Sequence, residues 1–199
     1  MKLAPLWSAM SARFWKYASS SDAGYSLVEM LITLVLTGIV LGMSVGFYPQ
    51  AVNIVRGDAD MRIVYWEMKL ARDTAIAQRR TIEVRFTAPD IITTVRREIP
   101  NGTTVLWNAV LEHNMQFLLV AGQPDTPDAF GRNTATYFGG AALVMFTPDG
   151  MLTDGNGNAV NGTVFLGQPG KPVTSRALTV FGPTATIRTY RWNGATWRH

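Results

Sequence analysis

Residues 30–48 form an apolar run of nineteen positions without a charged side chain, and this run is the strongest pattern in the chain. At about 1.5 Å per residue, a helix of this length is about 28 Å long, close to the thickness of the hydrocarbon layer of a bilayer. Because the run is apolar on every side, such a helix would pack against lipid or against copies of itself. We therefore predict a membrane span over residues 30–48.

Helical periodicity continues beyond the span. Pro49 is a point at which the helix could kink, but after it apolar residues recur at spacings of three and four, with charged residues largely on the other faces. The apolar positions are Val52, Val55, Ala59, Ile63, Trp66, Leu70 and Ala77. We predict one helix over residues 25–80, first membrane-spanning and then amphipathic, whose second half lies on a sheet with this stripe as its apolar face.

Residues 81–199 change to the alternating pattern that is typical of strands. Alternation is found in residues 81–86, 91–99, 103–110, 115–120, 142–146, 163–167, 176–182 and 186–192. Between them lie Asx-Gly pairs, which supply the positive φ of tight hairpins: Asn101-Gly102, Asp149-Gly150, Asp154-Gly155, Asn161-Gly162 and Asn193-Gly194. Residues 123–140 are expected to form a longer surface loop. The fold class is α+β, with a long helix packed on one mostly antiparallel, β-rich globular domain over residues 81–199.

Composition narrows the chemistry available to the chain. Its 199 residues include no cysteine, which excludes disulfides, thiolate metal sites and a cysteine nucleophile. The basic residues Lys2, Arg13 and Lys16 precede the span, and a large domain follows it. This order predicts a cytoplasmic N-terminus and a domain that crosses the membrane.

Glu29 stands at the leading edge of the apolar run, with no lysine or arginine beside it. A carboxylate that enters the hydrocarbon layer costs about 2.5–3.5 kcal/mol even on lenient insertion scales. Ionisable residues inside a membrane are usually functional, and a buried carboxylate is tolerable when it is paired. We therefore expect Glu29 to have a partner.

The sequence GYSLVE at residues 24–29 follows a basic leader and precedes about twenty apolar residues. It resembles the class III signal of type IV pilins and type II secretion pseudopilins, with a tyrosine where phenylalanine is usual. The resemblance implies that a prepilin peptidase cuts between Gly24 and Tyr25 and methylates the new amino terminus, so that residues 1–24 are a leader. It also implies that Glu29 selects and aligns the neighbouring subunit during assembly. The new amine would lie about one helical turn from Glu29 and could pair with it, as could the amine of another subunit.

Three further segments narrow the resemblance. They are ARDTAIAQRRTIEVRF at residues 71–86, ALVMFTPDGMLTDG at 142–155 and SRALTVFGPTATIRTYRW at 175–192. They resemble the H pseudopilins of type II secretion and the FimT-like minor type IV pilins. The implied function is that of a minor pseudopilin, a non-enzymatic subunit of a secretion pseudopilus with other pseudopilins as partners, anchored in the bacterial inner membrane with its domain in the periplasm. The alternatives are a minor type IV pilin that primes a pilus or captures DNA, and an uncut signal-anchored periplasmic domain.

The residues give almost no support for catalysis or for a metal site. His113, expected in a strand, and His199 are the only histidines, and no motif of a known catalytic class is present. The segment Asp154-Gly-Asn-Gly-Asn begins like a calcium loop, but its twelfth position is Phe165, which offers no carboxylate. A Gly/Asn hairpin is the preferred interpretation, and no cofactor or metal is expected.

The arginines near the C-terminus are the remaining candidates for binding. No acidic residue follows Asp154, and a basic tail suits either phosphate or a solvated sheet face. In FimT-like pilins a G-R-x-R motif is associated with DNA binding, but here Gly182 is separated from Arg188 and Arg191. Arg176, Arg188 and Arg191 are the candidate DNA contacts, although a spacing of three on a strand places Arg188 and Arg191 on opposite faces. Tyr190, Trp192 and Trp197 could stack on bases or pack within the hairpin.

Overall fold

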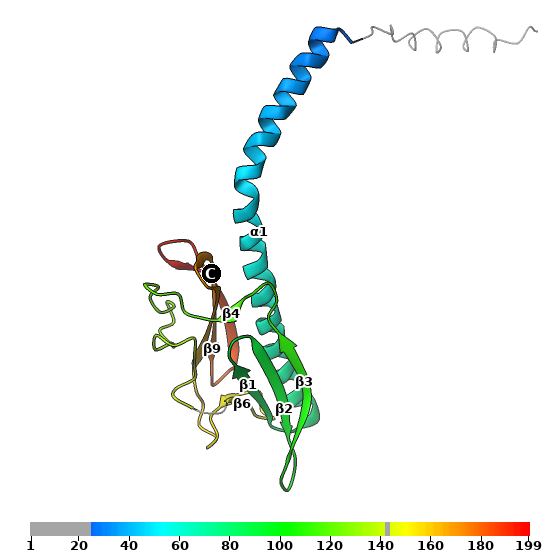
Figure 1. Ribbon diagram of the computed structural model, residues 1–199. Coiled ribbons are helices and arrows are strands. Elements are labelled where there is room, and N and C mark those ends of the chain that lie inside the picture. The colour runs from blue at the N-terminus through cyan, green and yellow to red at the C-terminus, as the bar shows by residue number, and fades with distance from the viewer. Residues whose placement is uncertain (1–24, 142–143) are drawn as a thin grey trace, which may run out of the picture. The chain divides into compact units, whose positions relative to one another are not determined.

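The computed structural model describes residues 25–141 and 144–199 (Figure 1). The leader predicted over residues 1–24, and Gly24 with it, lies outside the described residues. A single helix, α1 (Leu27–Gln78), comes first, and the sequence prediction of 25–80 differs from it by two residues at each end. This helix contributes to two compact units, Met1–Gly46 and Phe47–His199.

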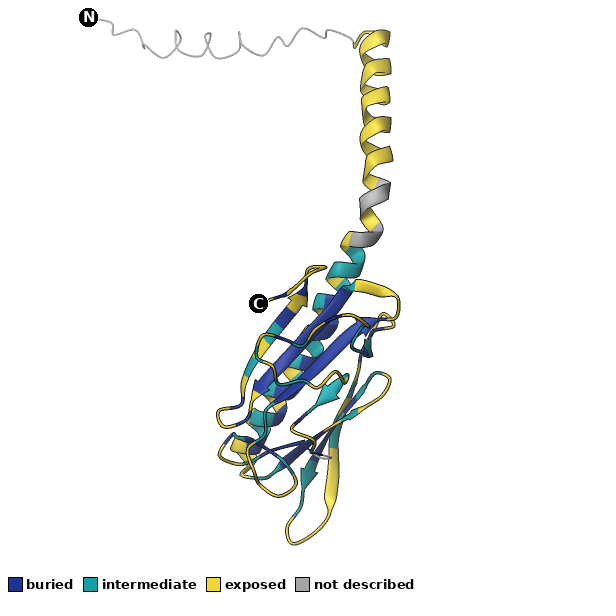
Figure 2. Ribbon diagram, turned by 90° about the vertical axis from the view of Figure 1, so that its left-hand side faces the viewer, coloured by how far each residue is buried: buried dark blue, intermediate teal, exposed yellow. Residues whose placement is uncertain are grey.

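Within the first unit, the described part of α1 is exposed along its length, as the upper part of the helix in Figure 2 shows. Residues Leu27–Ser44 have a mean hydropathy of 2.1 and form the one described helix long and apolar enough to cross a membrane. The side chains of Thr33, Thr37 and Ser44 donate hydrogen bonds to carbonyl oxygens three or four residues earlier in α1. Their hydroxyl groups therefore need no partner from a neighbouring molecule.

The second unit contains two antiparallel sheets. Sheet A has the order β3 (Thr103–Val110), β2 (Ile91–Arg97), β1 (Ile82–Thr87), β6 (Val144–Phe146) and β7 (Leu152–Thr153). Sheet B has the order β11 (Trp197–Arg198), β10 (Thr186–Trp192), β9 (Lys171–Phe181), β8 (Gly162–Gln168) and β4 (Gln116–Phe117). A further short strand, β5 (Thr136–Tyr137), also pairs with β8. The expected α+β fold is confirmed.

The main core lies between α1 and the inner faces of both sheets (Figure 2). The helix contributes Met61, Val64, Met68, Ala71 and Ala75, each at most 5% exposed. Sheet A contributes side chains such as Ile82 and Phe146, and sheet B contributes Leu166 and Leu178. Burying one large aliphatic side chain is worth about 1.5–3 kcal/mol, so this cluster is the main source of stability for the unit.

The sequence prediction about the helix face is wrong. The apolar stripe predicted to contact the sheet lies mainly on the outer face of α1, where Val55, Trp66 and Leu70 are 65%, 58% and 48% exposed. The face on the sheets begins instead with Gly57 and Asp60, which do not look apolar in sequence. Gly57 is needed there because a Cβ would come within 2.7 Å of the Thr174 carbonyl oxygen of β9. The close approach of β9 therefore determines which face of α1 is buried. The spacing of apolar residues in the sequence indicated a different face.

The predicted strands are found, with two local differences. Residues 115–120 keep only β4 as a strand, and the Asn161-Gly162 pair is not a hairpin turn. Gly162 is the first residue of β8, and a Cβ there would overlap the ring of Phe138 at 1.9 Å. Close packing against an aromatic ring therefore explains this glycine. Asn193-Gly194 does form the tight turn between β10 and β11, with φ of 103° at Gly194.

Candidate functional site

The candidate site at the start of α1 consists of Tyr25 and Glu29. Tyr25 precedes the helix and is 77% exposed, while Gly24 lies outside the described residues. Glu29 is in the first turn of α1, where unpaired backbone N–H groups and the helix dipole favour a carboxylate. It is the sole charged residue of Leu27–Ser44. The structure thus gives an apolar helix with a single carboxylate at its N-terminal end.

Two glycines in the same segment were missed by the sequence analysis. Gly38 and Gly42 are four residues apart on one face of α1, and a Cβ at either position would meet no atom of the chain within 4 Å. This G-x-x-x-G spacing lets two helix backbones approach closely in a membrane. The motif can be recognised in the sequence, and its two glycines lie within the exposed apolar surface of α1.

The outer face of the second half of α1 carries Val55, Trp66 and Leu70, and we call these three residues the outer stripe. They repeat at a spacing of eleven and then four residues and lie along one side of the helix. Trp66 also carries Lys69 over its ring at 5.0 Å and packs edge-on against Tyr65. The helix therefore presents apolar side chains to its surroundings in both units.

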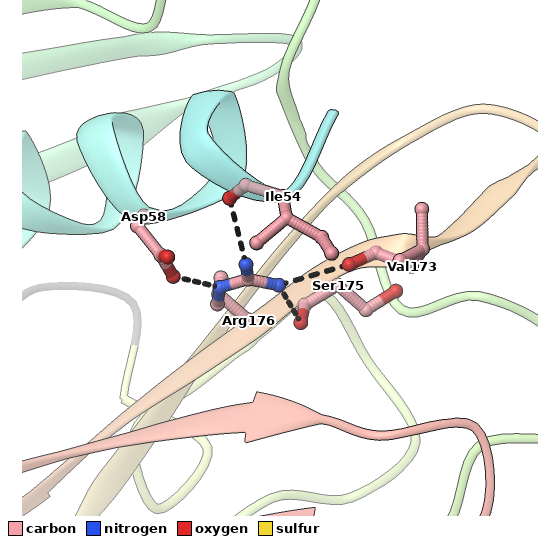
Figure 3. A network of polar contacts seen from close by, with 5 residues as sticks. All are labelled: Ile54, Asp58, Val173, Ser175 and Arg176. Atoms are coloured by element: carbon pink, nitrogen blue, oxygen red, sulfur yellow. Dashed lines mark hydrogen bonds and ion pairs between the residues drawn. The ribbon is translucent and has the colours of Figure 1, made fainter. Parts of the chain in front are cut away.

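Arg176 does not have the exposure expected of a DNA contact. It is 2% exposed and makes four hydrogen bonds, two of which join β9 to α1 (Figure 3). Its Nε donates to Asp58 Oδ1 at 2.6 Å and its guanidinium NH2 group to the Ile54 carbonyl, both on the helix. The other terminal nitrogen donates to the carbonyls of Val173 and Ser175. Burial lowers the pKa of Arg176, and the Asp58 carboxylate opposes this change. Arg176 is therefore a buried structural cation, with four of its five N–H donors in hydrogen bonds within the chain.

Arg188 and Arg191 lie on opposite faces of β10, as their spacing predicts. Arg188 faces away from α1 and donates to Asp128 Oδ1 at 2.7 Å. Arg191 pairs directly with Arg176 across the strands and therefore shares the face of sheet B toward α1. The structure thus does not assemble the three candidate arginines into one surface.

The aromatic residues near the C-terminus are packed, which leaves them unable to stack on bases. Tyr190, Trp192 and Trp197 are each 7% exposed and form a second cluster with Phe165 on the outer face of sheet B. The rings of Trp192 and Trp197 meet edge to face at 5.2 Å. The indole N–H of Trp197 donates to the carbonyl of Pro124, in the long loop after β4.

Asp128, which the sequence analysis did not single out, holds that loop on sheet B. It accepts hydrogen bonds from Thr179 at 2.6 Å, Arg188 at 2.7 Å and Tyr190 at 2.9 Å. Burial acts to raise the pKa of Asp128, but the donation from Thr179, Tyr190 and Arg188 outweighs it, so that this pKa lies below its ordinary value. One aspartate among many in a loop gives no sequence signal, because its partners come from two distant strands.

His113 and Asp60 also have structural roles. His113 lies in the turn between β3 and β4 with φ of 55°, so its expected place in a strand is wrong. Its Nδ1 is 3.4 Å from the fully buried Asp60 Oδ2, and Asp60 Oδ1 accepts from the Glu112 backbone N–H at 2.6 Å. Burial raises the pKa of Asp60, and these two contacts partly offset that rise. The pair fastens the turn to α1.

The Asp154 loop is a closed turn. Asp154 accepts hydrogen bonds from the backbone N–H groups of Asn156 and Asn158 at 2.8 Å and from the Asn158 side chain at 3.1 Å. The side-chain and backbone donors of Asn158 hold the pKa of Asp154 below its ordinary value. In the described part of the chain, no three histidine or acidic side chains gather closely enough to hold a metal ion.

Two family models match the chain, one over the apolar N-terminal segment and one over most of the second unit. The prokaryotic N-terminal methylation motif matches residues 19–45. The type II transport protein GspH matches residues 62–183, which is more than half of the chain. No curated protein matches the chain significantly.

Two solved structures of the minor pseudopilin EpsH from the type II secretion system of Vibrio cholerae resemble the chain. One has 13% identity and a TM-score of 0.47 and covers 68% of this chain and 97% of its own. The other has 15% identity and a TM-score of 0.46, over 72% of this chain and 96% of its own. On the family match over residues 62–183, together with the methylation motif ahead of it, the chain belongs to the GspH family of type II transport proteins.

Proposed function

We propose that this chain is a minor pseudopilin, a structural subunit of a type II secretion pseudopilus. The observation that carries this proposal is the helix α1, whose first half is apolar and exposed all round and contains one carboxylate, Glu29. An apolar helix of this kind is stable in lipid or in a bundle of similar helices, but not in water. Membership of the GspH family supports the same role.

Processing is the first step of the proposed role. A prepilin peptidase cuts between Gly24 and Tyr25 and methylates the new amino terminus. Tyr25 lies outside the helix and is 77% exposed, which supports access of an enzyme to this bond. The chain then spans the inner membrane with its N-terminus on the cytoplasmic side and the Phe47–His199 unit in the periplasm, because basic residues precede the span.

Assembly is the second step. The amino group of Tyr25, of the same chain or of a neighbour, pairs with Glu29, which offsets the cost of the carboxylate in the apolar layer and fixes the register of adjacent helices. Gly38 and Gly42 allow close approach of helices beside this contact. The outer stripe of Val55, Trp66 and Leu70 extends the helix-packing surface into the second unit.

Mass spectrometry of the full chain extracted from membranes tests the processing step. The expected product begins with N-methylated Tyr25 and lacks residues 1–24. A matched Gly24→Val variant should keep its leader, since it removes the residue before the cut. An intact leader in the parent chain would contradict both pilin-type functions and favour an uncut signal anchor.

No specific observation favours the alternative of a DNA-capturing minor pilin. Arg176 is buried, Arg188 and Arg191 lie on opposite faces, and the nearby tryptophans are packed. The three arginines predicted as DNA contacts therefore do not form the single cationic surface that duplex DNA requires.

A further inference from the structure

Three arginines stand directly opposite one another on three adjacent strands of sheet B. Arg191 of β10 pairs with Arg176 of β9 on one side and with Arg198 of β11 on the other. Directly paired residues project to the same face of a sheet, and this face is the one toward α1. Arg62 of α1 and these three arginines line one groove between the helix and the strands. The structure therefore gathers one arginine of α1 and three arginines of the consecutive strands β9, β10 and β11.

The positive charge of this arginine row is not balanced within the described chain. Asp58 pairs with Arg176 at 2.6 Å, and among residues 25–141 and 144–199 no ion pair is formed by Arg62, Arg191 or Arg198. All three of these arginines are exposed. Like charges directly opposite on adjacent strands destabilise a sheet. An anionic partner would relieve this repulsion.

The row lines a groove between α1 and the strands β9, β10 and β11, with a volume of about 940 Å³. This volume is near the upper end of the range of about 300–1,000 Å³ for ligand sites in proteins. Apolar groups of Ile54, Met61 and Tyr65 line the groove on the helix side. The groove thus combines the arginines of sheet B with apolar groups of α1, and Arg62 adds one cation on the helix side.

We propose that this groove binds an extended acidic segment of a partner protein, with carboxylates on Arg62, Arg191 and Arg198 and apolar side chains against α1. An extended peptide that alternates acidic and apolar residues presents the two kinds of side chain to opposite sides, as the groove requires. Single-stranded nucleic acid fits less well, because it needs exposed aromatic faces for stacking. Tyr190 and Trp192 contribute to the lining of the groove, but each is only 7% exposed and packs in the cluster with Trp197 and Phe165. This inference goes beyond the proposed function, since it assigns a ligand class to a second surface.

Binding of a fluorescein-labelled peptide, four repeats of Glu-Leu, to the full chain in neutral detergent micelles tests the proposal by fluorescence anisotropy. A peptide of four Gln-Leu repeats is the matched ligand control. We expect the Arg191→Gln/Arg198→Gln double variant to weaken binding of the acidic peptide about tenfold, which corresponds to 1.4 kcal/mol. Arg188→Gln removes a charge from the same strand but from the opposite face, and it should leave the affinity within about twofold.

Three results would overturn the proposal. They are equal binding of the Gln-Leu peptide, an equal loss of affinity in Arg188→Gln, and tighter binding of a 20-nucleotide single strand with the same dependence on Arg191 and Arg198. Thermal unfolding followed by circular dichroism shows whether the double variant is folded, and it should be at least as stable as the parent because repulsion is removed. Arg191→Lys, which keeps the charge, should retain most of the binding. Peptide binding needs neither leader removal nor assembly, so that failure of the proposed pseudopilin function would leave this result unaffected.

Discussion

Arg176 illustrates how burial changes the role of a charged residue from a surface contact to an internal one. In sequence it is one of five basic residues after Asp154, all equally available to a phosphate or to solvent. In the fold its donors meet Asp58 and three backbone carbonyls, and its side chain is the largest of the fully buried ones. Those carbonyls belong to the second half of α1 and to β9, so this single residue fastens the helix to sheet B.

Arg176→Ala should lower the free energy of unfolding by about 3 kcal/mol, because it leaves buried carbonyls and Asp58 without a donor. Arg188→Ala, on the exposed face of the neighbouring strand, should cost less than about 1 kcal/mol. Urea unfolding of the full chain in detergent, followed by tryptophan fluorescence, measures both. Equal effects would show that Arg176 is not the anchor of the helix.

The lowered pKa of Asp128 predicts how the stability of the fold changes with pH. A carboxylate whose pKa is lowered in the fold adds stability above its unfolded pKa of about 3.9, and this stability is lost as the pH falls through the lower, folded value. Asp128→Asn should therefore cost about 1–3 kcal/mol at pH 6, from weakened bonds to Thr179, Arg188 and Tyr190. The difference from the parent should shrink below about pH 4. Asp149→Asn, in an exposed turn, is the control and should leave the free energy of unfolding within about 0.5 kcal/mol of the parent.

At the scale of elements, α1 carries two apolar stripes that are offset around the same helix. One contains Met61, Val64 and Met68 and lies in the core, and the other is the outer stripe with Trp66 and Leu70. The core stripe has spacings of three and four residues and the outer stripe spacings of eleven and four, so that a helical period alone fits either. An isolated subunit leaves the outer stripe in water, which is the arrangement expected for a surface that a neighbouring subunit covers.

The two stripes should respond differently to substitution. Met68→Ala should lower the free energy of unfolding of the isolated chain by about 2–5 kcal/mol, because it opens a cavity in the core. Leu70→Ala, two residues further on the exposed face, should change it by less than about 0.5 kcal/mol. If the outer stripe packs in the filament, Leu70→Ala should nevertheless reduce assembly, measured by cross-linking in membranes. A large loss of stability in Leu70→Ala would contradict the assignment of the two faces.

At the scale of the whole molecule, the chain combines a helix suited to lipid or to other helices with a β-rich unit that has its own core. The charge of Glu29 has no role in the packing of that core, since it lies in the first unit. Under the proposed function Glu29 acts in assembly, and it is therefore the residue to alter in a test of that function.

Glu29→Gln should leave leader removal and membrane insertion unchanged but reduce cross-linking between neighbouring subunits by about fivefold or more, the loss expected for an ion pair worth about 1 kcal/mol or more. Insertion should not suffer, because an amide enters the apolar layer more easily than a carboxylate. Ser44→Ala is a control in the same helix, since the Ser44 hydroxyl bonds only to the Val40 carbonyl of its own chain. Unchanged cross-linking in Glu29→Gln would remove Glu29 from the assembly contact.

Local signals were sufficient for much of the fold. The apolar run, the alternating strands and the Asn193-Gly194 turn depend on short-range sterics and on partition between water and apolar surroundings, which each segment expresses by itself. Gly162 shows the limit of such signals. The dipeptide Asn161-Gly162 is typical of a turn, but Gly162 is the first residue of β8. It packs against the ring of Phe138, 24 residues earlier in the chain.

The sequence by itself determined that this protein has a charged residue at the head of an apolar helix and a β-rich domain behind it, because hydrophobicity and backbone preference act over a few residues. Only the tertiary structure decided which face of α1 is buried, that Arg176 is an internal anchor and that Asp128 fastens a loop. It also placed Arg191 and Arg198 beside Arg176 and across from Arg62. These features depend on strand register and on the approach of helix to sheet, which join residues as far apart in sequence as Asp58 and Arg176.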